Sequence, residues 1–208
     1  MRRNPNVSPV AAVHRGVMGA LALVSLAGAG SAQAQCDDSH RMAYLADVQS
    51  GATEQELESK YGFCRETSSS SALVTNYNVF YERMNGCGVH PQRKEAACDV
   101  EIRQSTGYGA FPGGSMEHVL FCFDCNVDGV WDFGTRGQVH VTNDVSGTMP
   151  SWYHAVIANA SNAPAMCAWG SGSAYRVRAI LSWAFQPTSC NFAPIWGNRF
   201  DFKARFDP

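Results

Sequence analysis

Lysine and long apolar segments are scarce in this chain of 208 residues. Only Lys60, Lys94 and Lys203 are lysines, and no basic cluster that could neutralise a run of phosphates follows the first 35 residues. Nucleic acid is therefore not expected as a partner. No apolar stretch beyond those residues suggests a membrane span, which needs about 20 residues. The catalytic motifs G-x-S-x-G and H-E-x-x-H are also missing, so no motif identifies a reaction.

The first 34 residues have the three parts of an export signal. Arg2, Arg3 and Arg15 supply basic charge, residues 16–30 form an apolar stretch, and Ala32-Gln33-Ala34 is an A-x-A cleavage site. We predict removal of residues 1–34 and a secreted or periplasmic mature protein. Losing these three arginines from the 16 basic residues leaves 13 against 18 acidic residues, a net charge of −5.

All eight cysteines follow this leader, which favours disulfides in an oxidising compartment. The predicted pairs are Cys36–Cys64, Cys87–Cys98, Cys122–Cys125 and Cys167–Cys190, although eight cysteines allow 105 pairings. Cys87 and Cys98 bracket a polar loop between two strands, Cys167 and Cys190 flank the expected strand at residues 175–185, and Cys122 and Cys125 are the pair that remains. A regular strand through Cys122 and Cys125 would point them to opposite faces about 10 Å apart, and each would then need another cysteine. A zinc site or a redox dithiol is the rival use of these residues, but no second C-x-x-C or histidine pair completes a zinc site.

Residues 35–66 have the pattern of a short helical hairpin. Asp37 or Asp38 can cap a first helix that ends near Gly51, and Thr53 with Glu56 forms a capping box for a second. Residues 67–71 form a polar connector. Cys36 and Cys64 flank both helices and would close the hairpin.

Residues 72–208 alternate polar and apolar side chains, which is typical of antiparallel strands with one solvent-exposed face. Turns rich in glycine and proline separate seven or eight short strands, and no helical pattern intervenes. The expected fold is mainly β: an antiparallel β-sandwich or jelly-roll-like domain, disulfide-braced and preceded by the helical hairpin. The expected strands span residues 77–84, 99–103, 117–123, 138–142, 152–158, 175–185 and 200–206.

Residues 124–132 follow the pattern D-x-N-x-D-G-x-x-D. This pattern resembles the first nine positions of the calcium loop of EF-hands and dockerins. The resemblance implies calcium as a cofactor. Its ligands would be Asp124, Asn126, Asp128, the Val130 carbonyl and Asp132. Thr135 replaces the bidentate acid of that loop, and a strand pattern precedes it, so a metal-free β-hairpin turn is the alternative.

Candidates for catalysis and for ligand contact are few. Glu117, His118 and His140 lie in expected strands and could serve a small secreted hydrolase. Trp131, Trp169 and Trp196 adjoin loops, where an exposed ring could stack on a sugar or anchor a protein contact. With no recognisable nucleophile, we expect a non-catalytic module that binds a glycan or an extracellular or envelope protein. The hydrolase is the alternative, and a structural or inhibitory envelope protein is a third.

Overall fold

The computed structural model describes residues 36–65, 73–144 and 152–207. The predicted leader (1–34) and connector (67–71) lie outside the described residues. Within these described ranges, two helices and a 3-10 turn precede eight strands. They are α1 (Asp38–Gln49), α2 (Glu54–Tyr61), the turn Gly62–Cys64, β1 (Val74–Asn76), β2 (Glu82–His90), β3 (Glu95–Ile102), β4 (Ser115–Asp124), β5 (Phe133–Val141), β6 (Trp152–Asn159), β7 (Ala174–Trp183) and β8 (Asn198–Arg205).

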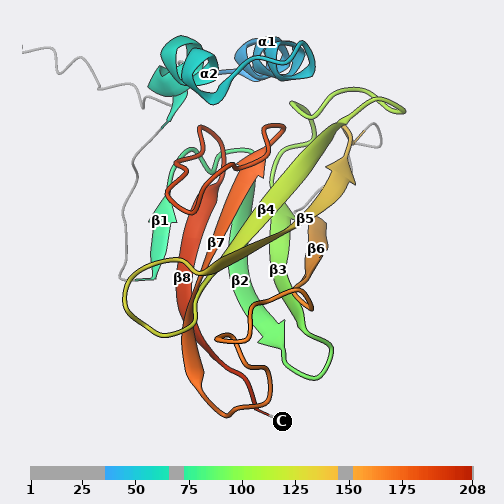
Figure 1. The fold of residues 1–208 in the computed structure, drawn as a ribbon. Helices are drawn as coiled ribbons and strands as arrows, with labels where there is room; N and C mark the ends of the chain where they lie inside the picture. The colour runs from blue at the N-terminus through green and yellow to red at the C-terminus, as the bar shows by residue number, and fades with distance from the viewer. Residues whose placement is uncertain (1–35, 66–72, 145–151, 208) are drawn as a thin grey trace, which may run out of the picture.

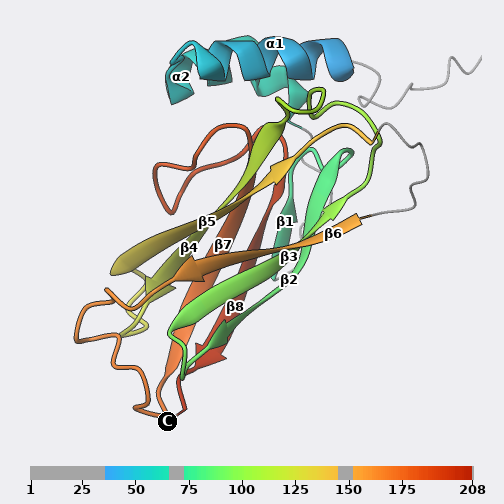
Figure 2. The same cartoon turned by 90° about the vertical axis from the view of Figure 1, so that its right-hand side faces the viewer.

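The strands form two antiparallel sheets that face each other (Figures 1 and 2). The larger sheet has the order β1-β8-β7-β4-β5 and the smaller has the order β2-β3-β6. The prediction of a mainly β, sandwich-like fold with an N-terminal helix pair and disulfides is therefore confirmed. No helix in the described part of the chain has the length and apolar content that a bilayer crossing requires.

The inner faces of the two sheets share one apolar core. Val119, Phe121 and Phe123 of β4 contribute to it from the larger sheet, and Val100 and Val156 from the smaller sheet. The outward side chains of β4 are buried as well, because a second small cluster of Leu120, Cys122, Ile180 and Phe192 forms on the outer face of the larger sheet. The β7–β8 connection, which carries Phe192, covers that face.

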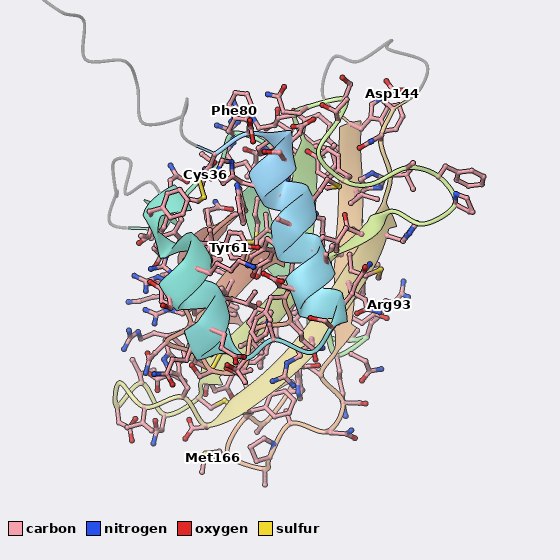
Figure 3. The ribbon with its side chains drawn as sticks, turned by 90° about the horizontal axis from the view of Figure 1, so that it is seen from above. Cys36, Tyr61, Phe80, Arg93, Asp144 and Met166 are labelled. Atoms are coloured by element: carbon pink, nitrogen blue, oxygen red, sulfur yellow. A yellow bond between two sulfur atoms is a disulfide. The ribbon has the colours of Figure 1, made fainter. Side chains whose placement is uncertain are left out.

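The helix pair lies across one end of the sandwich (Figure 3). Asp37 caps α1 by accepting hydrogen bonds from the amides of Ser39 and His40, and Thr53 and Glu56 form the predicted capping box of α2. Tyr44 of α1 stacks on Trp183 of β7 with ring centroids 5.7 Å apart. The hairpin thus shares the core of the sandwich.

Arg41 inserts from α1 into this core and is fully buried. Its Nε donates to the Gly107 carbonyl at 2.9 Å, and its Nη2 lies 3.0 Å from a carboxylate oxygen of Glu82. The guanidinium also lies 3.7 Å from the ring centroid of Trp183. A buried charge is tolerated only with such partners, so this ion pair fixes where the hairpin sits.

Four disulfides connect the eight cysteines. Cys36–Cys64 and Cys87–Cys98 occur as predicted. The other two predicted pairs are wrong: Cys122 bonds Cys190, and Cys125 bonds Cys167. The reason is that β4 continues to Asp124, so Cys122 belongs to the outer cluster with Leu120 whereas Cys125 belongs to the inner core. Two side chains on opposite faces of a strand cannot bond each other.

Candidate functional site

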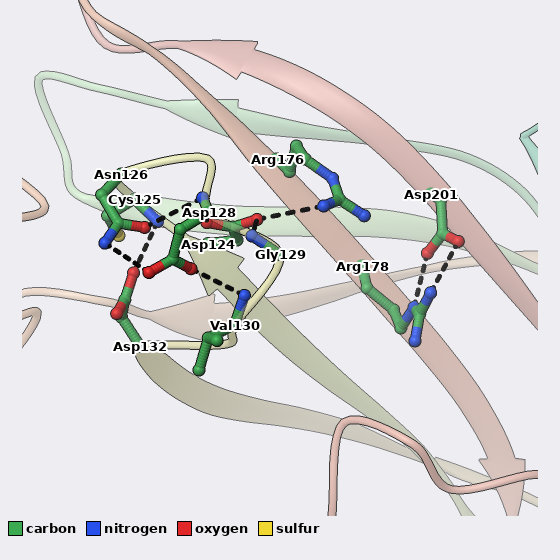
Figure 4. A network of polar contacts seen from close by, with 10 residues as sticks. All are labelled: Asp124, Cys125, Asn126, Asp128, Gly129, Val130, Asp132, Arg176, Arg178 and Asp201. Carbon is green, nitrogen blue, oxygen red and sulfur yellow. Dashed lines mark hydrogen bonds and ion pairs between the residues drawn. The ribbon is translucent and has the colours of Figure 1, made fainter.

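The predicted calcium loop leaves β4 at Asp124 and returns to β5 (Figure 4). The buried Asp124 carboxylate accepts hydrogen bonds from the amides of Asp128 (3.1 Å) and Gly129 (3.0 Å) and pairs with Arg176 at 3.1 Å. The Asp128 carboxylate accepts the Val130 amide at 2.8 Å, and Asp132 accepts the Cys125 amide at 2.8 Å. Backbone donors and one arginine therefore already hold the side chains that the resemblance assigns to calcium.

Asn126 completes this network, because its side-chain oxygen accepts the Asp128 amide and its Nδ2 donates to the Asp128 carboxylate at 2.9 Å. Val127 has a φ of 61° and Gly129 a φ of 94°, which gives the tight reversal of a hairpin turn. In residues 36–65, 73–144 and 152–207, no three histidine, cysteine, aspartate or glutamate side chains are grouped so that they could hold a metal ion.

The strand residues considered for catalysis point in different directions. Glu117 is fully buried on the inner face of β4, where neither oxygen has a hydrogen-bond partner among the described residues. His118 lies on the opposite face, and its Nε2 is 3.1 Å from the Ala184 carbonyl oxygen. His140 contacts the Gly113 carbonyl oxygen at 2.6 Å. Alternation along β4 thus separates the carboxyl from the neighbouring imidazole.

The three tryptophans considered for ligand contact are engaged within the fold. Trp196 is buried in the core, so the prediction that its ring is available to a ligand is wrong. Its exclusion from the surface follows from its edge-to-face contact with Trp183 at 5.7 Å. Trp169 is half-buried and stacks on Phe206 at 3.9 Å. Trp131 is also half-buried and packs against the outer cluster, with the Arg178 guanidinium 4.8 Å from its ring centroid.

A different surface brings an exposed ring and polar groups together: the outer face of the β2-β3-β6 sheet. We call it the small-sheet face. Strand register arranges nine of its residues in three rows that run across the sheet. The rows are Arg83–Glu101–Tyr153, Gly86–Asp99–Ala155 and Gly88–Ala97–Ile157.

Five residues of the second and third rows line a shallow trough of about 630 Å³, together with Cys87, Cys98, Tyr153 and His154. Four of these five row positions hold glycine or alanine, so that part of the floor is close to bare backbone. A Cβ built on Gly88 meets no atom within 4 Å, which shows that the space above this part of the floor is open. Tyr153 lines the same trough and is 62 % exposed. An exposed large ring beside a concave floor is a typical feature of a binding surface.

Polar groups at one end of the trough are held in place before any ligand arrives. Glu101, which lies opposite Tyr153, accepts hydrogen bonds from Arg83 Nη2 at 2.9 Å and from Asn85 Nδ2 at 3.0 Å. Asp99 accepts the Gly86 amide at 2.5 Å through one oxygen, and the other has no partner among the described residues. The face therefore offers amide and guanidinium donors next to a carboxylate acceptor.

Sequence reasoning missed Tyr153 although residues 152–158 were expected to form a strand. The alternation of that segment carries the signal: Val156 and Ala158 point into the core, which turns Tyr153, Ala155 and Ile157 outward. Ile157 is 55 % exposed. Two large apolar side chains on the exposed face of one strand are unusual enough to single the strand out.

No protein-family model, curated protein or solved structure matches this chain.

Proposed function

We propose that the protein is a non-catalytic binding module that holds a glycan on the small-sheet face. The observation that carries the proposal is the exposed Tyr153 ring in register with Glu101, next to a trough with a glycine and alanine floor. The trough provides a concave surface, and the Tyr153 ring provides apolar contact. The polar side chains around Glu101 provide hydrogen bonds that orient the ligand.

The chemistry of a sugar ring fits these three elements. One face of a pyranose consists largely of C–H groups, which can lie flat on an aromatic ring, while its hydroxyl groups point sideways as donors and acceptors. Arg83 and Asn85 can donate to such hydroxyls, and the unpartnered oxygen of Asp99 can accept from one. Because Glu101 already orients two of these groups, little side-chain entropy would be lost on binding.

The setting supports the same proposal. Four disulfides brace the described part of the chain, which suits an oxidising compartment. Together with the predicted export signal, they favour action outside the cytoplasm, secreted or in the periplasm, where glycans are abundant. Calcium binding by the loop at residues 124–132 remains a prediction from its pattern, separate from the glycan surface.

The test starts with an array of neutral, amino and acidic oligosaccharides, followed by calorimetry on those that bind the mature protein. We expect Tyr153→Ala to weaken binding by at least about 10-fold, because stripping one central aromatic contact typically removes that much affinity. Gly88→Val should also weaken binding, since the new side chain fills the trough without meeting a neighbour.

Phe111→Ala is the matched control, because Phe111 is 76 % exposed but lies in the loop between β3 and β4. It should leave binding unchanged. An array without any binder, or equal losses in the Tyr153 and Phe111 variants, would refute the glycan proposal. In that case, capture of a folded envelope protein through Tyr153 and Ile157 would be tested next.

A further inference from the structure

A second concavity lies between α2 and the connection from β7 to β8 (residues 184–197). It has a volume of about 480 Å³ and is separate from the small-sheet face. We call it the hairpin groove. Its floor is apolar, and its rim carries charged and polar side chains. The floor consists of Tyr44, Leu57, Phe185, Phe192 and Ile195, and the rim includes Glu54, Glu58 and Arg65.

The two walls of the groove are tied to each other at both ends. Arg65, which follows the 3-10 turn after α2, donates from Nε to the Pro194 carbonyl at 3.1 Å and from Nη2 to the Ala193 carbonyl at 2.8 Å. Thr188 donates to the Glu54 carboxylate at 2.8 Å. The disulfide from Cys190 to Cys122 also anchors the connection to β4. These contacts fix the two walls of the groove relative to each other.

The floor offers aromatic surface. Phe185 and Phe192 stack with their ring centroids 5.7 Å apart and with nearly parallel planes, 16° from each other. Leu57 and Ile195 complete an apolar surface beside them. A ligand that reaches this floor must therefore carry an aromatic or alkyl group.

Among the described residues, no cation neutralises one carboxylate of the rim. Glu58 forms a two-pronged ion pair with Arg65, which cancels both charges. Glu54 has only the Thr188 hydroxyl as a partner among the described residues, and its second oxygen is free. The net charge of the described lining residues is thus the single negative charge of Glu54, at the edge of an aromatic floor.

We propose that the hairpin groove binds a small organic cation, a primary ammonium group joined to an aromatic or alkyl body. The ammonium group would pair with Glu54, and the body would lie on Phe185 and Phe192. Carboxylates and ring faces both attract cations, so the two features select the same charge. An anion of the same size would face Glu54 at close range and be repelled.

Three probes of nearly equal shape test this proposal: 2-phenylethylammonium, the neutral 2-phenylethanol and the anionic phenylacetate. Binding to the mature protein is measured by ligand-observed saturation-transfer NMR and by titration calorimetry at low salt. We expect the ammonium to bind at least about 5-fold more tightly than the alcohol, and phenylacetate to bind most weakly.

Glu54→Gln should abolish the preference for the cation, because the amide keeps the contact with Thr188 but removes the charge. Asp207→Asn removes one exposed carboxylate far along the chain and should leave the preference unchanged. Tyr153→Ala should also have no effect, so failure of the glycan proposal would not mimic failure here. Equal binding of the three probes, no binding of any, or a cation preference that survives Glu54→Gln would overturn the proposal.

Discussion

Glu117 is the residue whose burial has the clearest energetic consequence. It lies fully buried on the inner face of β4, and neither oxygen has a hydrogen-bond partner among the described residues. Burial, and then the nearby Glu82 carboxylate, raise the pKa of Glu117 well above the ordinary value of 4.5. Arg41 only partly offsets these effects, because it forms its short ion pair with Glu82.

A raised carboxyl pKa makes stability depend on pH with a definite sign. The folded state holds the Glu117 proton more tightly than the unfolded state, so its contribution to stability is complete below pH 4.5 and is lost as pH rises toward the folded-state pKa. We expect Glu117→Gln to gain stability relative to wild type as pH increases, by at most about 1.4 kcal/mol per pH unit. Urea unfolding from pH 4 to pH 9 measures this difference. Parallel curves for the two proteins would contradict the expectation.

Asp128 allows the two interpretations of the loop at residues 124–132 to be separated. Its carboxylate accepts the Val130 amide and the Asn126 side chain, so Asp128→Ala should lower the free energy of unfolding by about 1 kcal/mol even with a chelator present. If the loop also binds calcium, millimolar calcium raises the melting temperature of wild type but not that of the variant. A stability difference that is identical with chelator and with calcium would make the calcium prediction wrong.

At the scale of elements, β5 approaches β6 of the other sheet through Gly137. A Cβ at Gly137 would lie 2.6 Å from the Ile157 carbonyl oxygen and 2.8 Å from Val156 Cγ1. Gly137→Ala should therefore cost about 1–3 kcal/mol, because backbone must move to make room. Gly134→Ala on the same strand is the control, since its Cβ would lie an ordinary 3.6 Å from Leu120. Urea unfolding of both variants measures the contrast, and similar losses would argue against a tight β5–β6 contact.

The elements themselves were predictable where local patterns determine them. The capping box at Thr53 and Glu56 and the alternation within β6 and β8 identified their segments correctly. The expected strand at residues 77–84 is correct only for residues 82–84, which begin β2; its first part is wrong, because Asn78 forms an isolated parallel bridge with Trp196 and its side chain donates to the Cys64 carbonyl. Trp196 and Cys64 are distant from Asn78 in the sequence, so the local pattern of polar and apolar residues cannot reveal these contacts.

The candidate site on the small-sheet face was also not predictable, because it depends on how distant parts of the chain pair. Tyr153 lies about 50 residues after Glu101 in the chain, and only the register of β3 and β6 places the two side chains opposite each other. The openness of the face depends in turn on the glycines of β2. The sequence of any one of these strands does not reveal the site, because the site forms only when the three strands pair.

The disulfides act on the whole molecule, because they close loops of very different length. The separations are 68 residues for Cys122–Cys190, 42 for Cys125–Cys167, 28 for Cys36–Cys64 and 11 for Cys87–Cys98. In the chain-entropy account, closing a longer loop removes more freedom from the unfolded chain, about 4 kcal/mol for the longest of these loops and about 3 kcal/mol for the shortest.

Replacing each pair by two serines should therefore lower the free energy of unfolding most for Cys122–Cys190 and least for Cys87–Cys98. Urea unfolding of the four double variants measures the order.

Loss of Cys122–Cys190 has a further consequence, because this bond anchors the connection that forms one wall of the hairpin groove. We expect that variant to lose cation binding in the groove while Cys87→Ser/Cys98→Ser retains it. The reverse pattern would contradict the role assigned to the anchored wall.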